Sequence, residues 1–245
     1  MLPATFNRLV WSNLVAQSAE QIALAAAPIV AVLLLGAGEG ATGALQTALT
    51  LPFVLFAIPA GLMADRMKRR RLMAAAEALR AGALLAILLA IVTGTLTLWL
   101  LALLGFVAVC GTVVYSVAGP ALVPSMVSPQ SLPAANARIE LGRTVAFAAG
   151  PALGGLLVGW IGAGPAFGFA AALSIVAVVL LSGIVEPARE PKPRRHPWQE
   201  IKEGASFVFH HELLRPVFVT QFIFNTAWFL IQSVFVPYGV HKLGL

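Results

Sequence analysis

The sequence is poor in the residues that soluble enzymes and secreted domains depend on. Only 11% of its 245 residues are charged, and it has a single cysteine, Cys110. One thiol inside an apolar run excludes an intrachain disulfide and a thiolate metal cluster, so we expect a small core residue there. No nucleophile, phosphate-binding loop or cluster of metal ligands stands at the edge of an apolar run. We therefore expect neither an enzyme nor a bound cofactor or metal.

Apolar residues are what the sequence has in excess. They make up 59% of the chain, and the mean hydropathy of +0.89 lies outside the range of soluble domains. The net charge of +6 comes from basic residues at the ends of apolar runs, with no aromatic-interleaved patch, which argues against a nucleic-acid partner. The sequence predicts an all-α, polytopic membrane bundle surrounded by the lipid bilayer.

Seven apolar runs are each long enough to cross about 30 Å of hydrocarbon as a helix. They lie at 11–35, 43–63, 74–93, 98–121, within 132–163, at 165–185 and at 217–240. The sixth run carries no charge, so we expect it to serve packing and lipid contact. A Pro-rich basic stretch and an amphipathic segment separate the sixth run from the seventh. We expect a six-helix bundle over 1–185, a linker with an amphipathic helix over 186–215, and the first helix of a second bundle over 216–245.

Positive charge predicts the orientation in the membrane. The loop between the second and third runs holds five Lys or Arg residues, and the linker with its helix holds six. The three loops on the other face hold none. Because basic loops stay inside, we expect a multi-pass protein of the cell membrane with a cytoplasmic N-terminus.

Polar residues interrupt the first run at Gln17, Glu20 and Gln21. An acid in a membrane span costs about 2.5 kcal/mol or more unless it faces protein or water, so Glu20 is expected to point into the bundle. It is the leading candidate for ion coupling or substrate contact, with Asn225 of the last run as a further cavity residue. The alternative is that Glu20 is a paired or neutral packing residue, and the sequence leaves both open.

The third and fifth runs each begin with ionisable residues. Glu77 and Arg80 are three residues apart, on one helix face, and can pair near the cytoplasmic end. A role in a cytoplasmic gate and a purely local pair both remain open. A second group precedes the fifth run and is expected to face Asp65 or Glu77 across the bundle. Its members are Arg138, Glu140 and Arg143.

The loop GLMADRMKRRRLM, residues 61–73, joins the second and third runs. Its glycine would let two helices approach closely, its arginines hold the loop in the cytoplasm, and its one acid is available to them. The alternative is a topogenic loop with no mechanical role. The spacing resembles the G-x-x-x-D-R-x-G-R-R/K signature of the major facilitator superfamily (MFS), with Lys68 in place of the second glycine. The matching residues are Gly61, Asp65, Arg66, Arg69 and Arg70.

The fifth run contains a second motif, in which small residues four apart permit close helix packing. Gly150, Pro151, Gly154 and Gly155 resemble the G-P-x-x-G-G motif of the superfamily's exporters. Within the superfamily the chain is most similar to the drug and siderophore exporter branch typified by the enterobactin exporter. Many proton-coupled facilitators carry an arginine in the fourth span. This chain has none there, which counts against that particular kind of antiport.

The resemblance implies a secondary transporter that exports small amphipathic molecules by alternating access, with protons as the expected coupling ion. The resemblance implies that the basic loop belongs to the cytoplasmic gate and that the glycines of the fifth helix allow this helix to bend. Family transporters have twelve or more spans in two halves, so the chain resembles one truncated after seven. We would not expect it to transport alone, without the C-terminal half or a second chain.

Two alternative functions belong to other classes of membrane protein. A non-transporting membrane scaffold or assembly partner is favoured only by the apparent truncation. A seven-helix receptor or light-driven pump would need, for a retinal protein, a lysine in the last span. None lies between 217 and 240, and the expected orientation of the N-terminus is opposite to that of such proteins.

Overall fold

A computed structural model of the chain describes residues 3–186 and 197–238, and over these residues the fold is helical without a strand. This confirms the prediction of an all-α protein. The first compact unit is Met1–Lys192 and the second is Pro193–Leu245. The helices are α1 (Ala4–Leu33), α2 (Glu39–Arg66), α3 (Arg69–Val92), α4 (Leu98–Leu122), α5 (Leu132–Ile161), α6 (Ala163–Ser182), α7 (Pro197–His210) and α8 (Leu214–Tyr238). Two short 3₁₀ turns, Val123–Ser125 and Pro129–Ser131, connect α4 to α5.

Six of the described helices, α1 to α6, are long and apolar enough to cross a membrane. Their continuity follows from the sequence, because twenty or more residues with few charges favour a helix in which every backbone group is satisfied internally. The reversal from α5 to α6 is made by Gly162, whose φ of +100° strains any residue with a side chain. These observations confirm a polytopic helical bundle.

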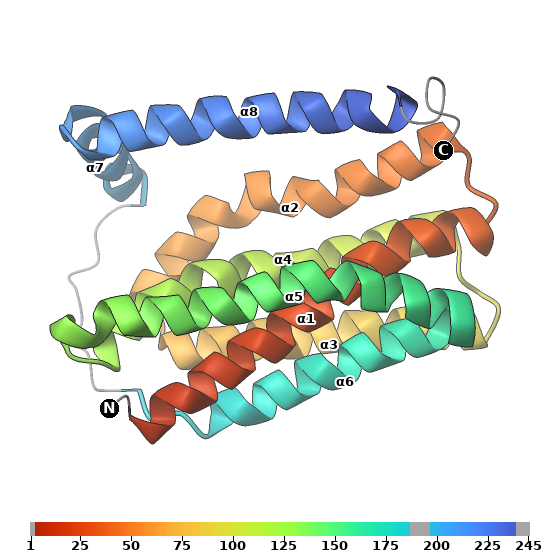
Figure 1. Ribbon diagram of the computed structural model, residues 1–245, viewed down its shortest axis with the longest axis horizontal. Helices are drawn as coiled ribbons and strands as arrows, with labels where there is room; N and C mark the ends of the chain where they lie inside the picture. Colours follow the sequence, from red (N-terminus) through yellow and green to blue (C-terminus); the bar gives the residue numbers. More distant parts are fainter. Residues whose placement is uncertain (1–2, 187–196, 239–245) are drawn as a thin grey trace. The chain divides into compact units, whose positions relative to one another are not determined.

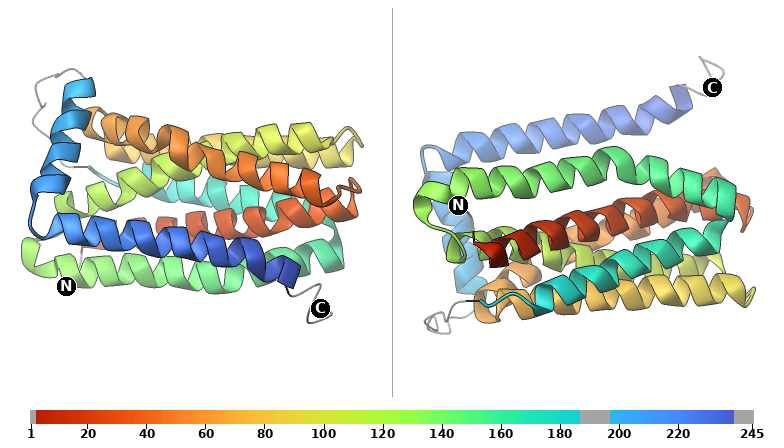
Figure 2. Two further views of the ribbon diagram at one scale, coloured as in Figure 1. Left: turned by 90° about the horizontal axis from the view of Figure 1, so that it is seen from above. Right: turned by 60° about the horizontal axis from the view of Figure 1, so that its bottom comes forward.

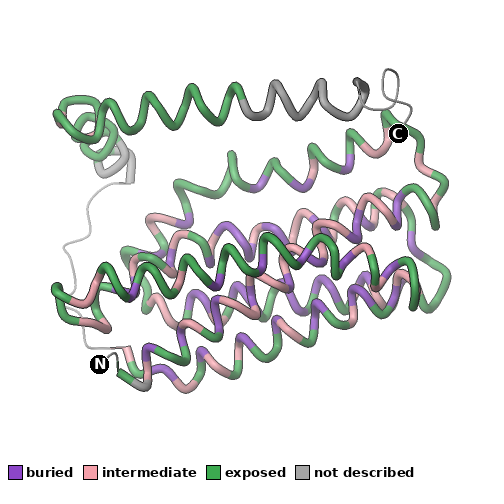
Figure 3. The backbone as a smooth tube through the Cα atoms, in the orientation of Figure 1, coloured by how far each residue is buried: buried purple, intermediate pink, exposed green. Residues whose placement is uncertain are grey.

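The first unit is an open arc of helices. α1 packs against α5 and α6, α3 packs against α6 and α4, and α2 packs against α4 (Figures 1 and 2). This order leaves α5 and α2 at the two ends of the arc. In each of them 22% of the most apolar window is buried, against 44% in the other four helices. The same contrast is visible as mostly exposed stretches along α2 and α5 (Figure 3).

The buried core of this unit consists of two apolar clusters, one after the other along the helices. On α1 the first cluster ends at Ala16 and the second begins at Ala19. On α6 they are separated between Ala171 and Ala177. Buried polar and charged side chains lie near this division. They are Ser12, Asn13, Glu77, Arg80, Thr112 and Ser174.

The second unit contains α7 and α8. α7 covers the segment for which an amphipathic helix is predicted, and Phe209 of α7 meets Phe218 of α8 edge to face at a ring-centroid distance of 5.3 Å. α8 covers most of the seventh predicted span. Residues 239–240, the end of that span, lie outside the described residues.

Candidate functional site

Two charged side chains of α3 lie in the centre of the six-helix unit. Glu77 is 0% and Arg80 is 1% exposed. Arg80 Nη2 is 3.1 Å from Glu77 Oε1, and Arg80 Nη1 donates to the carbonyl of Ala16 on α1 at 2.8 Å. α4 approaches α3 closely here, because a Cβ on Gly111 would lie 2.5 Å from the Ala76 carbonyl oxygen. Arg80 thus links α3 to α1 through a backbone carbonyl and pairs with a carboxylate of its own helix.

Glu20 of α1 joins this pair one helical turn beyond Ala16. Its side chain is partly buried, its Oε2 atom is fully buried without a hydrogen bond, and its charged neighbours are Arg80, Glu77 and Arg143. The sequence predicted an interior position for Glu20. It also predicted that Glu77 and Arg80 pair, with a gate role and a local role both open, and the structure shows this pair with Glu20 as a charged neighbour.

Uncharged polar groups surround the three charges. Tyr115 of α4 is buried, and its hydroxyl is 3.2 Å from Ser12 Oγ on α1. Ser174 of α6 lies beside Glu77, and its buried hydroxyl makes no hydrogen bond in the described structure. The sixth span therefore contributes a polar group to the centre as well as packing. A serine in an uncharged run gives no signal in the sequence, because small hydroxyls are common in membrane helices.

A cavity of about 30 Å³ adjoins Glu20 and Arg80. This is space for about one water molecule. Its wall is otherwise almost wholly apolar, with one further polar side chain, Thr112. The apolar residues that line it are Ala23, Leu24, Ala27, Leu49, Leu84, Ile87, Leu101, Gly105, Ala108, Val109 and Phe167. Of the predicted cavity residues, Glu20 reaches this space.

The other predicted cavity residues lie elsewhere. Gln21 packs against α5, where a Cβ on Gly150 would be 2.4 Å from the Gln21 Cβ. Gln17 is partly buried on α1. Asn225 belongs to the second unit, where its side-chain amide donates to the carbonyl of Gln221 at 2.8 Å.

The basic loop ties together the helix ends at one end of the bundle. Asp65 Oδ1 and Arg69 Nη2 are 3.9 Å apart, and the Arg69 guanidinium also donates to the carbonyl of Ala121 at the end of α4. Arg70 Nη1 donates to the carbonyl of Ser182 at the end of α6 at 2.7 Å. Arg66, also in this loop, is exposed. The loop's arginines therefore act on backbone carbonyls as well as on Asp65.

Glu186 is a second acid at this end, and the sequence reasoning missed it. Its carboxylate accepts hydrogen bonds from the backbone N–H groups of Arg69 and Arg70, at 3.1 and 3.0 Å, and so caps the N-terminus of α3. That terminus has no acidic residue of its own and no side-chain cap from Lys68. Glu186 follows α6 on the same side as the basic loop by the predicted topology, which is the signal that could have identified it.

Two expectations for the basic loop need correction or refinement. The close helix approach predicted at Gly61 is wrong for the described residues, because a Cβ there would meet nothing within 4 Å. Lys68, which replaces the signature's second glycine, has φ −64° and ψ 115°, an ordinary extended conformation. The turn therefore forms without glycine and without backbone strain.

The second ionisable group on α5 pairs locally. Arg143 Nε is 3.0 Å from Glu140 Oε2, and both side chains are more than half exposed. Arg138 donates to Asn7 Oδ1 at 3.4 Å. These are the contacts of that group in the described structure, in place of the predicted approach to Asp65 or Glu77. Arg143 still adds its charge to the surroundings of Glu20.

The fifth-helix motif faces in two directions. A Cβ on Gly154 would lie 2.8 Å from the Ile22 carbonyl oxygen of α1, so Gly154 and Gly150 allow α5 and α1 to touch. Pro151 is exposed, and a Cβ on Gly155 would meet nothing within 4 Å. Half of the motif thus serves the contact between α1 and α5, as generic helix packing would.

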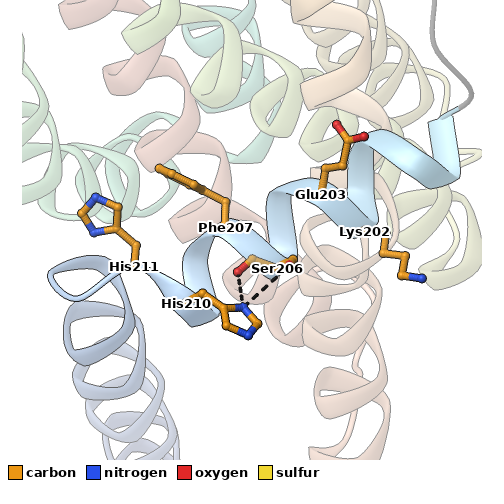
Figure 4. A pocket seen from close by; sticks show the side chains of 6 residues that line it. All are labelled: Lys202, Glu203, Ser206, Phe207, His210 and His211. Atoms are coloured by element: carbon orange, nitrogen blue, oxygen red, sulfur yellow. Dashed lines mark hydrogen bonds between the residues drawn. The ribbon is translucent and has the colours of Figure 1, made fainter.

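Surface residues of α7 line an open hollow, drawn in Figure 4. His210 Nδ1 is 2.8 Å from the Ser206 carbonyl oxygen, and the ring of His211 meets that of Phe207 at a centroid distance of 5.1 Å. The two histidines, the last residue of α7 and the residue after it, thus point apart (Figure 4). Among the described residues no group of three potential metal ligands is found.

Comparison with known proteins decides the family. Residues 3–236 match the model of the family MFS_3, described as "Transmembrane secretion effector". The chain belongs to this family. It is also 29% identical over 127 residues to an uncharacterized MFS-type transporter of Sinorhizobium fredii, a match that covers 49% of this chain and 31% of that relative. The chain is therefore a multi-pass membrane protein of the major facilitator superfamily, as the spacing in its basic loop predicted.

Proposed function

We propose that this MFS_3 chain is part of a secondary transporter that exports small amphipathic molecules, coupled to the entry of protons. The observation that carries the proposal is the buried charge cluster in a six-helix membrane bundle. A carboxylate held between membrane helices is expensive to place there and is retained where an ion or substrate must bind. Transport, rather than catalysis, is the use that such a position supports.

The arc of helices supports a mechanism of alternating access. In transporters with two helical halves, the substrate path lies between the halves, and one half rocks against the other. α2 and α5, the least buried of the six spans, provide the surface on which we place a second bundle, from a C-terminal half or from a second chain. The closely packed α1 and α5 would move as one body because their backbones touch at Gly154.

The basic loop takes the part of the cytoplasmic gate in this proposal. It joins the ends of α3, α4 and α6 through Arg69, Arg70 and Glu186, so that end of the bundle moves as a unit. The positive charge of the loop supports a cytoplasmic position for the loop and, with it, for the N-terminus. The likeness to the drug and siderophore exporter branch supports the outward direction of transport.

Drug accumulation in an efflux-deficient bacterium tests this function. The 245-residue chain and the same chain extended to twelve spans are compared, each with Glu20→Gln and with Asp65→Asn. We expect export by the extended chain, dependence on the proton gradient, and loss of that dependence in Glu20→Gln. Export with unchanged rate and pH dependence in Glu20→Gln would contradict the proposal. Export by the short chain would show that a complete path forms without the extension.

A further inference from the structure

We propose that Glu20, Glu77 and Arg80 together form one proton-binding site, in which two carboxylates from α1 and α3 share a single proton beside a single arginine. This inference rests on the proposed function and deepens it, because it replaces one titrating residue with a three-residue site. Arg80 and Glu77 become residues of the site itself, although the sequence suggested a place for them at the gate.

Geometry brings the three side chains together. Arg80 is held from α1 by the Ala16 carbonyl and from its own helix by Glu77, so its guanidinium has little freedom to turn elsewhere. Glu20 stands four residues after Ala16, which is one turn of the same helix. Glu20 and Arg80 also line the same small cavity. Any movement of α1 along α3 therefore changes the distances from Glu20 to Arg80 and to Glu77.

Several polar atoms of Glu20, Glu77 and Arg80 make no hydrogen bond in the described structure. Both oxygens of Glu77, Oε2 of Glu20, and Nε and Nη2 of Arg80 are buried without a hydrogen bond in the described structure. Arg80 Nη2 is close to Glu77 Oε1 at 3.1 Å, yet the contact lacks the alignment of a hydrogen bond. Buried polar atoms are normally satisfied, and exceptions of this kind mark functional positions.

The summed charge of the three side chains indicates that the site would bind one proton. The two carboxylates and the one buried guanidinium sum to a net charge of −1, and Arg143 adds its charge to Glu20 from the exposed surface of α5. The charges of Glu20 and Glu77 interact, and like charges in the buried core raise the free energy of the doubly ionised state. One bound proton makes the site neutral. The proton adds to a carboxylate oxygen, and no other bond forms or breaks.

The surroundings favour a proton over a metal cation. The cavity of about 30 Å³ holds about one water, and Thr112 is its remaining polar side chain. Sodium sites in transporters use the carbonyls of unwound helix segments. α1 and α3 are continuous helices at Glu20 and Glu77, without an unwound segment of that kind.

Other groups face the site from every neighbouring helix. Arg143 of α5 adds a positive charge near Glu20 from the exposed side. Tyr115 of α4 stands near Glu77 and Arg80, with its hydroxyl occupied by Ser12, and Ser174 of α6 lies beside Glu77. Arg80 is the one cation among the buried residues of the described core. It is therefore the residue that decides how many protons the two carboxylates retain.

Infrared titration of the purified protein in detergent tests the site without any transport step. The band of protonated carboxyl groups is followed against pH in the parent protein, in Glu20→Gln, in Glu77→Gln and in the matched control Glu39→Gln. Glu39 is exposed at the start of α2, away from the cluster. We expect one buried titrating proton per chain, lost in both Glu20→Gln and Glu77→Gln and unchanged in Glu39→Gln.

Arg80→Met provides the opposite test. Without the arginine both carboxylates should hold a proton at neutral pH, which doubles the buried carboxyl signal. If that variant does not fold, Arg80→Met combined with Glu20→Gln and Glu77→Gln leaves no buried charge, and it should fold and show no buried titration. A signal that is lost in Glu20→Gln but intact in Glu77→Gln would overturn the shared site, and so would a signal from the triple variant.

The two proposals fail in different ways. If the infrared titration behaves as expected while efflux by the extended chain is independent of the proton gradient, the shared site stands and the proposed function is wrong. If efflux depends on protons through Glu20 while Glu77→Gln leaves the titration unaltered, the function stands and the shared site is wrong.

Discussion

Two groups of arginines and glutamates lie along the same bundle and are held in different ways. At the end with the basic loop, Arg70 and Arg8 donate to carbonyls at the end of α6, and Glu186 accepts from two N–H groups at the start of α3. In the middle, Glu77 and Arg80 are more deeply buried but leave polar atoms without a hydrogen bond.

The difference follows from where each group meets the helices. A helix end leaves backbone N–H and C=O groups without an internal partner, so charged side chains there find bonds. In the middle of a helix these groups are already engaged, so apart from the bond from Arg80 to the Ala16 carbonyl the central charges must rely on other side chains. The loop group thus stabilises the fold, whereas the central group holds charges that a proton can still satisfy.

The largest change in stability should follow the removal of the buried arginine of the central group. We expect Arg80→Met to lower the free energy of unfolding by about 3–5 kcal/mol, because it breaks the buried ion pair with Glu77. The control Arg143→Met removes a side chain that is 56% exposed and should cost less than about 1 kcal/mol. Unfolding in mixed detergent micelles measures both. Equal losses would contradict the distinction between a buried and a surface arginine.

Backbone contact near the central group offers the next test. Gly154→Ala places a Cβ 2.8 Å from the Ile22 carbonyl oxygen, and separating α5 from α1 should cost about 1–3 kcal/mol. Its neighbour Gly155 has open space at the same position, so Gly155→Ala should be close to neutral. The same unfolding measurement applies. A neutral Gly154→Ala would show that the contact between α1 and α5 is loose.

At the loop end, Glu186→Gln weakens two charge-assisted hydrogen bonds to the start of α3, where three arginines already oppose the helix dipole. We expect a loss of about 1 kcal/mol and faster hydrogen exchange at the Arg69 and Arg70 amides. Glu39→Gln is the matched control, since Glu39 also lies in the first turn of a helix. Exchange that is no faster in Glu186→Gln than in Glu39→Gln would rule out the cap.

The smallest effect is expected for the exposed pair of Glu140 and Arg143. A double-mutant cycle on this pair should give a coupling of less than about 1 kcal/mol that falls with added salt. The same cycle on Glu77 and Arg80 should give a larger coupling with little response to salt, because the pair is buried. Similar salt dependence in the two cycles would remove the contrast between the centre and the surface.

Much of the fold was predictable from local patterns. The apolar runs match α1 to α6 closely; the predicted fourth run, for example, begins at Leu98, as α4 does. The interior position of Glu20 was predictable because a charge in a membrane span must avoid lipid. The contacts of Gly61, in contrast, were not predictable. A glycine permits a close approach, but its sequence position does not say whether another helix comes near.

The amino-acid sequence by itself determined that the chain is helical, where its six described spans run, and through the spacing of Asp65 and Arg69 to which superfamily it belongs. Only the tertiary structure decided that Arg80 and Glu20 line one cavity and that Glu186 caps α3. The physical reason is the range of the forces involved. Helix period and hydropathy act over a few neighbouring residues, whereas charge partners far apart in the sequence are set by how the helices pack.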